Sequence, residues 1–345
     1  GNEYKDDRVY GKIDLTLELA KGLKWIGRIG GDFTNARQRN WNAIAKPSAG
    51  SWNYGYKNEE PGTYQENNSY TGQLDVTSYL NADYSFGDDL RLTGVAGVNY
   101  NDRSGYALNS FLYGLSQPNW YSLLNGTDKP LTSSSIYQRR LFGVLGQFDL
   151  SYKDWAFVTL SMRNDWSSTL PIGKNSYFYP GVNTSVILTD AVPSLKENNI
   201  LNYMKLRAAW GQTGNDASQY MTSSVITPTQ VALGYGSLYT PIDGVLGLTE
   251  GNRAANQALR PELTTEVEFG FEAKLLNNRL GVDATYYNKN TKDQILTSTI
   301  NGVSGYGEAL FNAGEVKNWG YELTLGVTPF QNKDWEWKVD LNWAK

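Results

Sequence analysis

Residues 266–289 alternate between polar and apolar side chains with a period of two. From 266 to 274 every second residue is charged or glycine, and the residues between them are apolar. The alternation resumes after the pair Asn277-Asn278. This pattern predicts two antiparallel strands joined by a tight turn, with one apolar face and one polar face.

The same alternation recurs along the whole chain and predicts about twelve strands, most of ten or more residues. Strands of about 9–11 residues are needed for a tilted crossing of a lipid bilayer. The clearest further runs are 9–19, 73–86, 90–101, 142–152, 156–162, 178–188, 204–210, 319–327 and 335–343.

Short and long connections alternate between the predicted strands. The short ones are 21–22, 87–89, 153–154, 277–278 and 331–334, with a somewhat longer one at 189–202. The long ones are 35–69, 104–136, 214–261 and 293–314, with a modest one at 168–175. An up-and-down meander with short turns at one end and long loops at the other produces this order.

The apolar face needs a partner that excludes water. No second apolar layer and no helical period is visible, and a bare face of about twelve strands would expose roughly ten times the few hundred Å² that soluble monomers tolerate. In these strands the apolar parity lacks Lys and Arg, which cost about 2–4 kcal/mol each when they face lipid. We therefore predict lipid contact, with an aromatic girdle near strand ends formed by Trp25, Tyr152, Trp155, Trp319 and Trp335. A soluble carbohydrate-binding β protein is the alternative.

Composition narrows the chemistry further. The 345 residues include no Cys and no His, so a disulfide, a thiolate nucleophile, an imidazole base and an ordinary zinc site are excluded. The net charge of −4 is mild and Lys and Arg are scattered, so no nucleic-acid partner is expected. We expect no metal and no cofactor. No signal peptide is recognisable at the start, which suggests that it was removed or that the chain is a piece of a longer protein.

Several segments together resemble the barrel of SusC/RagA-type TonB-dependent outer-membrane transporters, and the resemblance runs over essentially the whole chain. Their order and spacing carry the resemblance more than any single segment does. The segments are SMRNDWSSTLP at 161–171, MKLRAAWGQTGN at 204–215, LRPELTTEVEFGFEAKLLNNRLGVDATYYN at 259–288 and GEVKNWGYELTLGVTP at 314–329.

The resemblance implies an all-β, transmembrane, antiparallel up-and-down β-barrel of 22 strands with an internal plug domain. Residues 1–345 would supply about twelve interior strands, with long extracellular loops and short periplasmic turns, while the plug, the signal peptide and the C-terminal strands are absent from this chain. The expected location is the outer membrane of a Gram-negative bacterium. We expect no enzymatic activity.

The same resemblance implies import of oligosaccharides, driven by the proton gradient through TonB pulling on the plug. A SusD-like surface lipoprotein would form a lid over the mouth, and two SusC–SusD pairs would form a dimer in outer-membrane lipid. A peptide importer of the same family and a non-transporting surface or adhesion barrel remain as alternatives.

Charged residues on the polar parity are expected to line the water-filled lumen. Ser and Asp near residue 165 have the types of a nucleophile and its partner, but without any His a luminal ion pair and turn-capping serines are the simpler interpretation. The Glu row likewise fits a polar lumen better than a glycosidase site. The segment GQTGN at 211–215 is interpreted as a turn. The luminal candidates are Arg163, Asp165, Glu266, Glu268 and Glu272.

Aromatic residues in the long loops are the candidates for contact with substrate or with the lid. Sugar rings have apolar CH faces that stack on aromatic rings. The alternative is that these side chains pack the loops on one another. The candidates are Trp41, Trp52, Tyr54, Tyr56, Tyr64, Trp120 and Tyr121.

Overall fold

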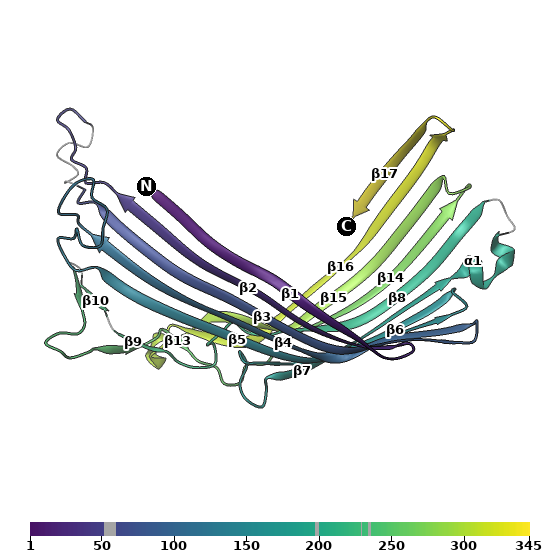
Figure 1. Cartoon of the computed structure of the whole chain (residues 1–345), viewed down its shortest axis with the longest axis horizontal. Coiled ribbons are helices and arrows are strands. Elements are labelled where there is room, and N and C mark those ends of the chain that lie inside the picture. Colours follow the sequence, from purple (N-terminus) through teal and green to yellow (C-terminus); the bar gives the residue numbers. More distant parts are fainter. Residues whose placement is uncertain (52–59, 197–199, 229, 234–235) are drawn as a thin grey trace. The chain divides into compact units, whose positions relative to one another are not determined.

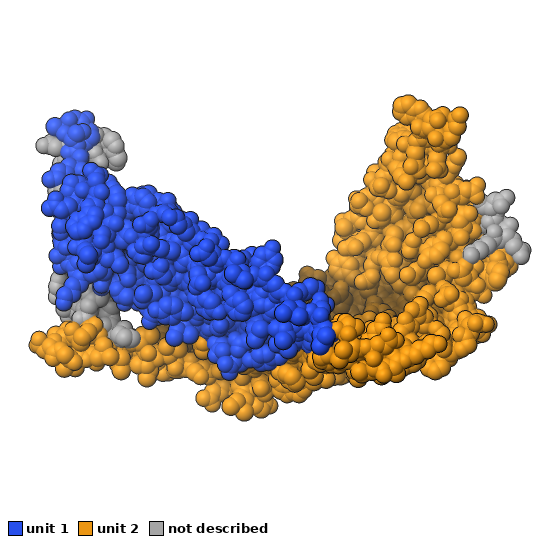
Figure 2. All heavy atoms as spheres, in the orientation of Figure 1, with its two compact units in different colours: residues 1–15, 27–77, 100–140 blue, residues 16–26, 78–99, 141–345 orange. Residues whose placement is uncertain are grey.

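The computed structural model describes residues 1–51, 60–196, 200–228, 230–233 and 236–345. The chain divides into two compact units, which Figure 2 shows in different colours. Unit 1 contains residues 1–15, 27–77 and 100–140, and unit 2 contains residues 16–26, 78–99 and 141–345.

The described residues are almost entirely β-structure, which confirms the predicted all-β class (Figure 1). Twelve strands have nine or more residues, as the alternation predicted. They are β1 (Asn2–Ala20), β2 (Leu23–Asn42), β3 (Thr63–Phe86), β4 (Leu90–Tyr113), β5 (Leu131–Tyr152), β6 (Ala156–Ser167), β7 (Ser176–Ile187), β8 (Leu201–Asn215), β14 (Glu262–Leu275), β15 (Leu280–Thr299), β16 (Glu308–Gln331) and β17 (Glu336–Ala344).

Five short strands lie between β8 and β14: β9 (Ile226–Pro228), β10 (Gln230–Leu233), β11 (Gly236–Tyr239), β12 (Leu248–Glu250) and β13 (Arg253–Ala254). The helical elements are α1 (Leu188–Ala191) and two single 3₁₀ turns, η1 (Pro193–Lys196) and η2 (Gly302–Ser304). Within the described residues, none of these helices has the length and hydropathy needed to cross a bilayer.

The long strands form one sheet in which neighbours in sequence are neighbours in space. The order is β1-β2-β3-β4-β5-β6-β7-β8-β14-β15-β16, with β17 paired to β16. The registers from β5 to β8 and from β14 to β17 are antiparallel, which confirms the predicted meander. The short β13 adds to β16 in parallel.

Several strands are longer than the alternation predicted, so the loops are shorter. β3, β4 and β16 have 24 residues each. At about 3.3 Å per residue each is about 80 Å long, well beyond the roughly 30 Å hydrocarbon core even when tilted. Beyond the lipid both faces meet water, so backbone pairing continues where the hydrophobic alternation ends. For the same reason Trp319 lies in the middle of β16, whereas the girdle prediction placed it near a strand end.

The register of unit 2 confirms that the two parities form two faces. Directly paired residues of antiparallel strands place their side chains on the same face. Phe269 pairs with Ala208 on one side and Tyr286 on the other, and Tyr286 pairs with Tyr321. One row along the sheet is thus apolar across four strands, from β8 to β16.

Large apolar side chains on this face are open to the surroundings. In unit 2, Phe269 is 55% exposed, Leu341 58% and Trp343 53%. In unit 1, β1 shows the same feature, because Val9 and Ile13 are both more than two-thirds exposed. Water-exposed rows of this size are unfavourable, whereas hydrocarbon solvates them.

A charge on either face of β16 tests this arrangement. Leu325 pairs with Val282 and Leu341 on the apolar face, and the adjacent Thr324 pairs with Asp283 on the polar face. We expect Leu325→Lys to lower the free energy of unfolding in lipid vesicles by about 2–4 kcal/mol. Thr324→Lys, the matched control, places its ammonium near the Asp283 carboxylate and should change the free energy of unfolding little. Equal losses in urea titrations of the two variants would contradict the assignment of the faces.

Candidate functional site

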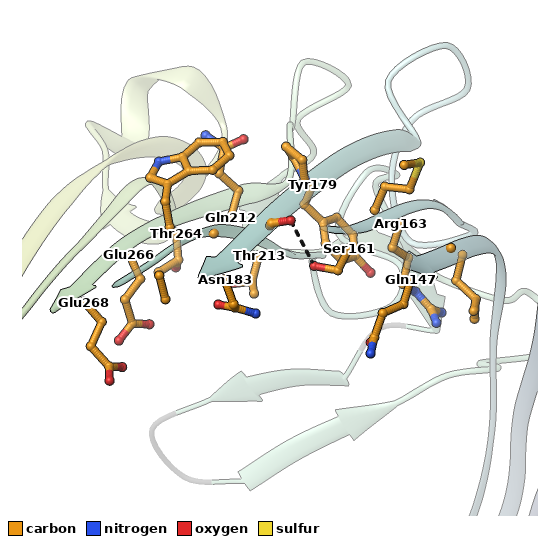
Figure 3. A pocket seen from close by; sticks show the side chains of 18 residues that line it. Gln147, Ser161, Arg163, Tyr179, Asn183, Gln212, Thr213, Thr264, Glu266 and Glu268 are labelled. Carbon is orange, nitrogen blue, oxygen red and sulfur yellow. Dashed lines mark hydrogen bonds between the residues drawn. The ribbon is translucent and has the colours of Figure 1, made fainter. Parts of the chain in front are cut away.

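A hollow of about 540 Å³ lies on the polar face of unit 2 (Figure 3). Its floor is the point where Gly181 of β7 pairs with Gly211 of β8. A Cβ added to Gly211 would have only two heavy atoms within 4 Å, the nearer being the Gly181 Cα at 3.8 Å. The backbone is therefore open at Gly211, whereas the Ser161 hydroxyl lies close to Gly181, where an added Cβ would be 2.6 Å from Ser161 Oγ. GQTGN at 211–215 is part of β8, so its interpretation as a turn was wrong.

Polar side chains surround this floor on neighbouring strands. A single row of paired residues runs across β5, β6, β7, β8, β14 and β15 in the order Gln147, Ser161, Gly181, Gly211, Glu266 and Lys289. Figure 3 shows the side chains of Gln147, Asn183, Glu266 and Glu268 extending to the same side of the sheet. The polar residues lining the hollow are Gln147, Ser161, Arg163, Tyr179, Asn183, Gln212, Thr213, Thr264, Glu266 and Glu268.

The predicted ion pair at one edge of the hollow is present. Arg163 Nε donates to Asp165 Oδ1 at 2.8 Å, and the Tyr179 hydroxyl donates to the other oxygen of the same carboxylate. Arg163 Nη2 also reaches Asn99 Oδ1 at 3.4 Å. Because Asp165 is only 4% exposed, its charge is held beside the guanidinium and shielded from water. A buried carboxylate needs such partners.

Ser167 has the turn-capping contact that the sequence suggested. Its Oγ accepts a hydrogen bond from the backbone N–H of Thr169 at 3.3 Å, where β6 ends. The Thr169 hydroxyl donates to Asp216 at 2.9 Å, and Ser167 also donates to that carboxylate. The connection 168–175 is therefore tied to the beginning of the connection between β8 and β14.

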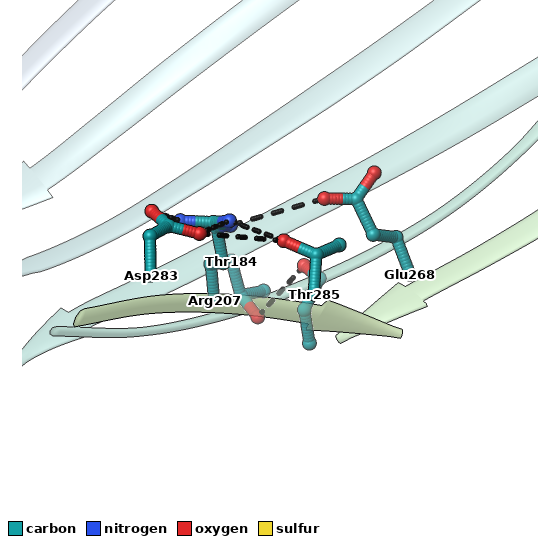
Figure 4. Close-up of polar contacts among 6 residues, drawn as sticks. Thr184, Arg207, Glu268, Asp283 and Thr285 are labelled. Atoms are coloured by element: carbon teal, nitrogen blue, oxygen red, sulfur yellow. Dashed lines mark hydrogen bonds and ion pairs between the residues drawn. The ribbon is translucent and has the colours of Figure 1, made fainter. Parts of the chain in front are cut away.

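A second charged group bridges three strands (Figure 4). Arg207 of β8 donates to both oxygens of Asp283 on β15, at 3.0 and 2.7 Å, and to the Thr285 hydroxyl at 2.5 Å. Glu268 of β14 lies 3.8 Å from its Nε. The strand between β8 and β15 is β14, and the residue that Arg207 crosses there is Gly270, which pairs with both Arg207 and Thr285.

Gly270 is a requirement of this contact. A Cβ added at Gly270 would lie 2.1 Å from Arg207 Nε, which is too close for any real contact. Only a residue without a side chain lets the guanidinium lie across β14 and reach the neighbouring strand. The bidentate geometry makes this a strong charge-assisted contact.

Substitution at Gly270 tests the bridge. We expect Gly270→Ala and Asp283→Asn each to lower the free energy of unfolding by about 1–3 kcal/mol. Because both remove the same contact, the double variant should lose little more than either single variant. Gly281→Ala, where a Cβ meets nothing closer than 3.8 Å, is the control. Additive losses in urea titrations would contradict the bridge.

At the end of the sheet where β6, β14 and β16 meet their longer connections, the chain forms a small apolar core. Leu259 is fully buried, and it clusters with Leu170, Ala217 and Leu310. Asn256 Nδ2 donates to the Leu310 carbonyl at 2.7 Å. Both ends of the connection between β8 and β14, near residues 217 and 256–259, thus contact β16 and the connection between β6 and β7.

Ion pairs and hydrogen bonds reinforce this anchoring. Arg260 forms an ion pair with Asp293 at 2.9 Å, and its backbone N–H donates to Asn312 Oδ1 at 2.9 Å. Tyr306 donates its hydroxyl to Glu250, and this hydrogen bond to the carboxylate raises the pKa of the Tyr306 phenol. The loop end is therefore held in one arrangement by many contacts.

Truncation of Leu259 tests the loop core. We expect Leu259→Ala to destabilise the anchored connection by about 2–5 kcal/mol, because it leaves a cavity among buried side chains. Limited proteolysis should then cut within 216–261 faster, while the long strands stay intact. Leu248→Ala, at a side chain that is 59% exposed, is the control. Unchanged cleavage in Leu259→Ala would show that the cluster does not hold this segment.

The aromatic candidates of unit 1 are placed differently from the prediction. Trp41 lies in β2 and Tyr64 in β3, so the assignment of both to a loop was wrong, because these strands extend past the point where the alternation ends. Tyr64 is 3% exposed, and the Trp41 and Tyr121 rings lie 5.4 Å apart between centroids. Trp120 is half exposed. Trp52, Tyr54 and Tyr56 lie outside the described residues.

The acidic row has no arrangement that suggests metal binding. Glu272 lies 4.0 Å from Lys274 on the same strand, and the Glu266 and Glu268 carboxylates line the hollow. In the part of the chain that the structure describes, no group of three acidic side chains is placed to hold a metal ion. The sequence could have indicated the hollow through glycines on the polar parity of two strands, but their pairing depends on register.

A large antiparallel sheet with an exposed apolar face and a charged opposite face defines an outer-membrane barrel region. The chain matches the family described as "TonB dependent receptor-like, beta-barrel" over residues 1–345, and it belongs to that family. TonB-dependent receptors are outer-membrane transport proteins and not enzymes. The resemblance to SusC/RagA-type transporters is thereby confirmed.

Individual relatives agree with this assignment. TonB-dependent receptor P26 of Formosa agariphila is 25% identical over 333 residues, which cover 94% of this chain and 32% of the relative. TonB-dependent receptor SusC of Bacteroides thetaiotaomicron is 24% identical, covering 96% and 31%. The structure of the RagAB peptide transporter superposes with a TM-score of 0.83 at 21% identity, over 99% of this chain and 36% of that one. The chain thus spans about a third of the length of these proteins.

Proposed function

We propose that this chain forms part of the barrel of a transporter that imports oligosaccharides across the outer membrane of a Gram-negative bacterium, with energy supplied through TonB. The observation that carries the proposal is the separation of the two faces by register. Lipid solvates the apolar face, and the polar face lines a water-filled substrate path. Arg163, Asp165, Glu266, Glu268 and Glu272 lie on that path.

The chemistry of the polar face supports a sugar as cargo. A sugar hydroxyl both donates and accepts hydrogen bonds, and the hollow offers both kinds of partner: Asn and Gln amides, Ser and Thr hydroxyls, and carboxylates. The half-exposed Trp120 presents a ring on which the CH face of a sugar stacks. The next residue, Tyr121, packs with Trp41 against the buried cluster that contains Tyr64.

The partners follow from the family. In a longer protein, residues 1–345 supply interior strands of the barrel, and a plug domain connects the barrel to TonB. A SusD-like surface lipoprotein covers the loop end as a lid, and two such pairs form a dimer. The anchored core around Leu259 gives that lid a stable surface.

Peptide import is the second candidate. The Glu266 and Glu268 carboxylates would also pair with the ammonium group of a lysine or of a peptide N-terminus. RagAB, whose structure superposes on this chain, is described as a peptide importer, but at 21% identity that likeness concerns the fold.

Energy coupling and cargo are testable in the organism that carries the gene. We expect deletion to abolish growth on a neutral oligosaccharide and to leave growth on peptides unchanged. Loss of TonB should abolish uptake of the labelled oligosaccharide, while binding to the cell surface persists, because capture needs no energy and passage does. Uptake that continues without TonB would contradict the mechanism, and loss of growth on peptides alone would favour the second candidate.

A further inference from the structure

We propose that the hollow over Gly181 and Gly211 is a subsite for one neutral, hydroxyl-rich sugar unit, and that its charge selects against acidic sugars. The inference rests on the proposed import of oligosaccharides and adds to it a location and a substrate class. It depends on three features: the open floor at Gly211, the mixed hydrogen-bonding rim and the excess of negative charge.

The floor is shaped to admit a ring. Gly181 and Gly211 pair directly, so two neighbouring strands lack side chains at the same level of the polar face. The space above Gly211 is open, since an added Cβ would touch only the Gly181 Cα and the Pro180 carbonyl, at 3.8 and 4.0 Å. On both sides the row continues with a polar residue, Ser161 on β6 and Glu266 on β14. A flat ligand can therefore lie against the backbone at Gly211, between Glu266 and the Ser161 hydroxyl that covers Gly181.

The rim supplies complementary hydrogen-bonding groups. The Asn183 amide and the Thr213 hydroxyl can both donate and accept. Gln147, Ser161 and Thr264 already bond to Asp149, to the Gly181 carbonyl and to Thr291, and their oxygens add acceptor capacity. Glu266 and Glu268 only accept. An ammonium group needs acceptors alone, so the donors of this rim would go unused with a cationic ligand. A sugar unit with several neighbouring hydroxyls uses both.

The cations near the hollow are already neutralised by other groups. Arg163 is paired with the buried Asp165 at 2.8 Å, and Arg207 is paired with Asp283 at 2.7 Å. The adjoining hollow of about 460 Å³ is lined by Glu266, Glu268 and Glu322 together with Arg207 and Lys289. Arg207 also lies 3.8 Å from Glu268, so with Asp283 included four carboxylates surround two cations, Arg207 and Lys289. The surface is net negative, so a uronic acid or a sulfated sugar meets like charge.

Filling the hollow tests the location. In the full-length transporter with its partner lipoprotein, Gly211→Gln places an uncharged side chain over the floor. The control is Gly281→Gln, because Gly281 lies on the same face and a Cβ there meets only the Gly326 carbonyl, at 3.8 Å. The probes are neutral oligosaccharides (glucan, mannan, fructan and xylan), an oligogalacturonate and a lysine-containing peptide, with Kd measured by calorimetry. For the neutral probe that binds the wild type most tightly, we expect Gly211→Gln to raise Kd about tenfold or more, as loss of one or two hydrogen bonds to charged groups implies.

A charge substitution tests the selectivity without changing volume. We expect Glu266→Gln to shift the ratio of Kd values for neutral and acidic oligosaccharides about tenfold toward the acidic probe. Glu336→Gln removes a carboxylate that lies on β17, outside the residues lining the hollow, and should leave the ratio unchanged. The Glu266→Gln variant keeps the proposal testable if Gly211→Gln fails to fold.

The outcomes separate the subsite from the proposed function. If the wild type, Gly211→Gln and Gly281→Gln all bind the neutral oligosaccharide with the same Kd, the subsite is overturned. The proposed import of oligosaccharides is then unaffected. An unchanged ratio in Glu266→Gln overturns the charge selection. A wild type that binds the peptide, or no probe at all, overturns the import of oligosaccharides and the subsite with it.

Discussion

Every feature of this chain depends on the period of two that backbone pairing imposes on a strand. Because successive side chains point to opposite faces, a strand that meets hydrocarbon on one side and water on the other must alternate. Register then extends the alternation from one strand to the next, as the row from Ala208 through Phe269 and Tyr286 to Tyr321 shows. A shift of one residue would expose every charge in a strand to lipid.

Glycines on the polar face have two different effects in this sheet. On the polar face of unit 2, Gly270 lets Arg207 cross a whole strand to reach Asp283, which stabilises the sheet. Gly211 has no side chain lying over it, although the Ser161 hydroxyl comes close to its partner Gly181, and it leaves a hollow among hydrogen-bonding groups. The space that a side chain would occupy is filled by Arg207 at Gly270, whereas at Gly211 it is open to a ligand. A glycine on the polar face therefore serves both the stability of the sheet and the proposed binding site.

The alternation and the turns could be predicted from the sequence because both are local. Lys153-Asp154 and Asn277-Asn278 adopt the positive φ values of tight turns, where the residue types indicated them. The ends of the strands could not be predicted, because β2 and β3 extend to Trp41 and Tyr64, past the point where the alternation ends, and there the packing of the connections decides which side chains are buried. The hollow was missed for another reason. The segment 211–215 has the composition of a turn. Only the pairing of Gly211 with Gly181 shows that Gly211 forms the floor of the hollow.

The direct test of the central claim is the environment of successive residues along one strand. Single cysteines placed at positions 320–327 of β16 can carry spin labels in the full-length protein, with other thiols removed, in lipid vesicles. The account predicts that collision rates alternate, with lipid-soluble oxygen reaching labels at the odd positions and a water-soluble nickel complex reaching labels at the even positions. The reverse assignment, or rates without a period of two, would contradict the claim that lipid solvates the apolar face.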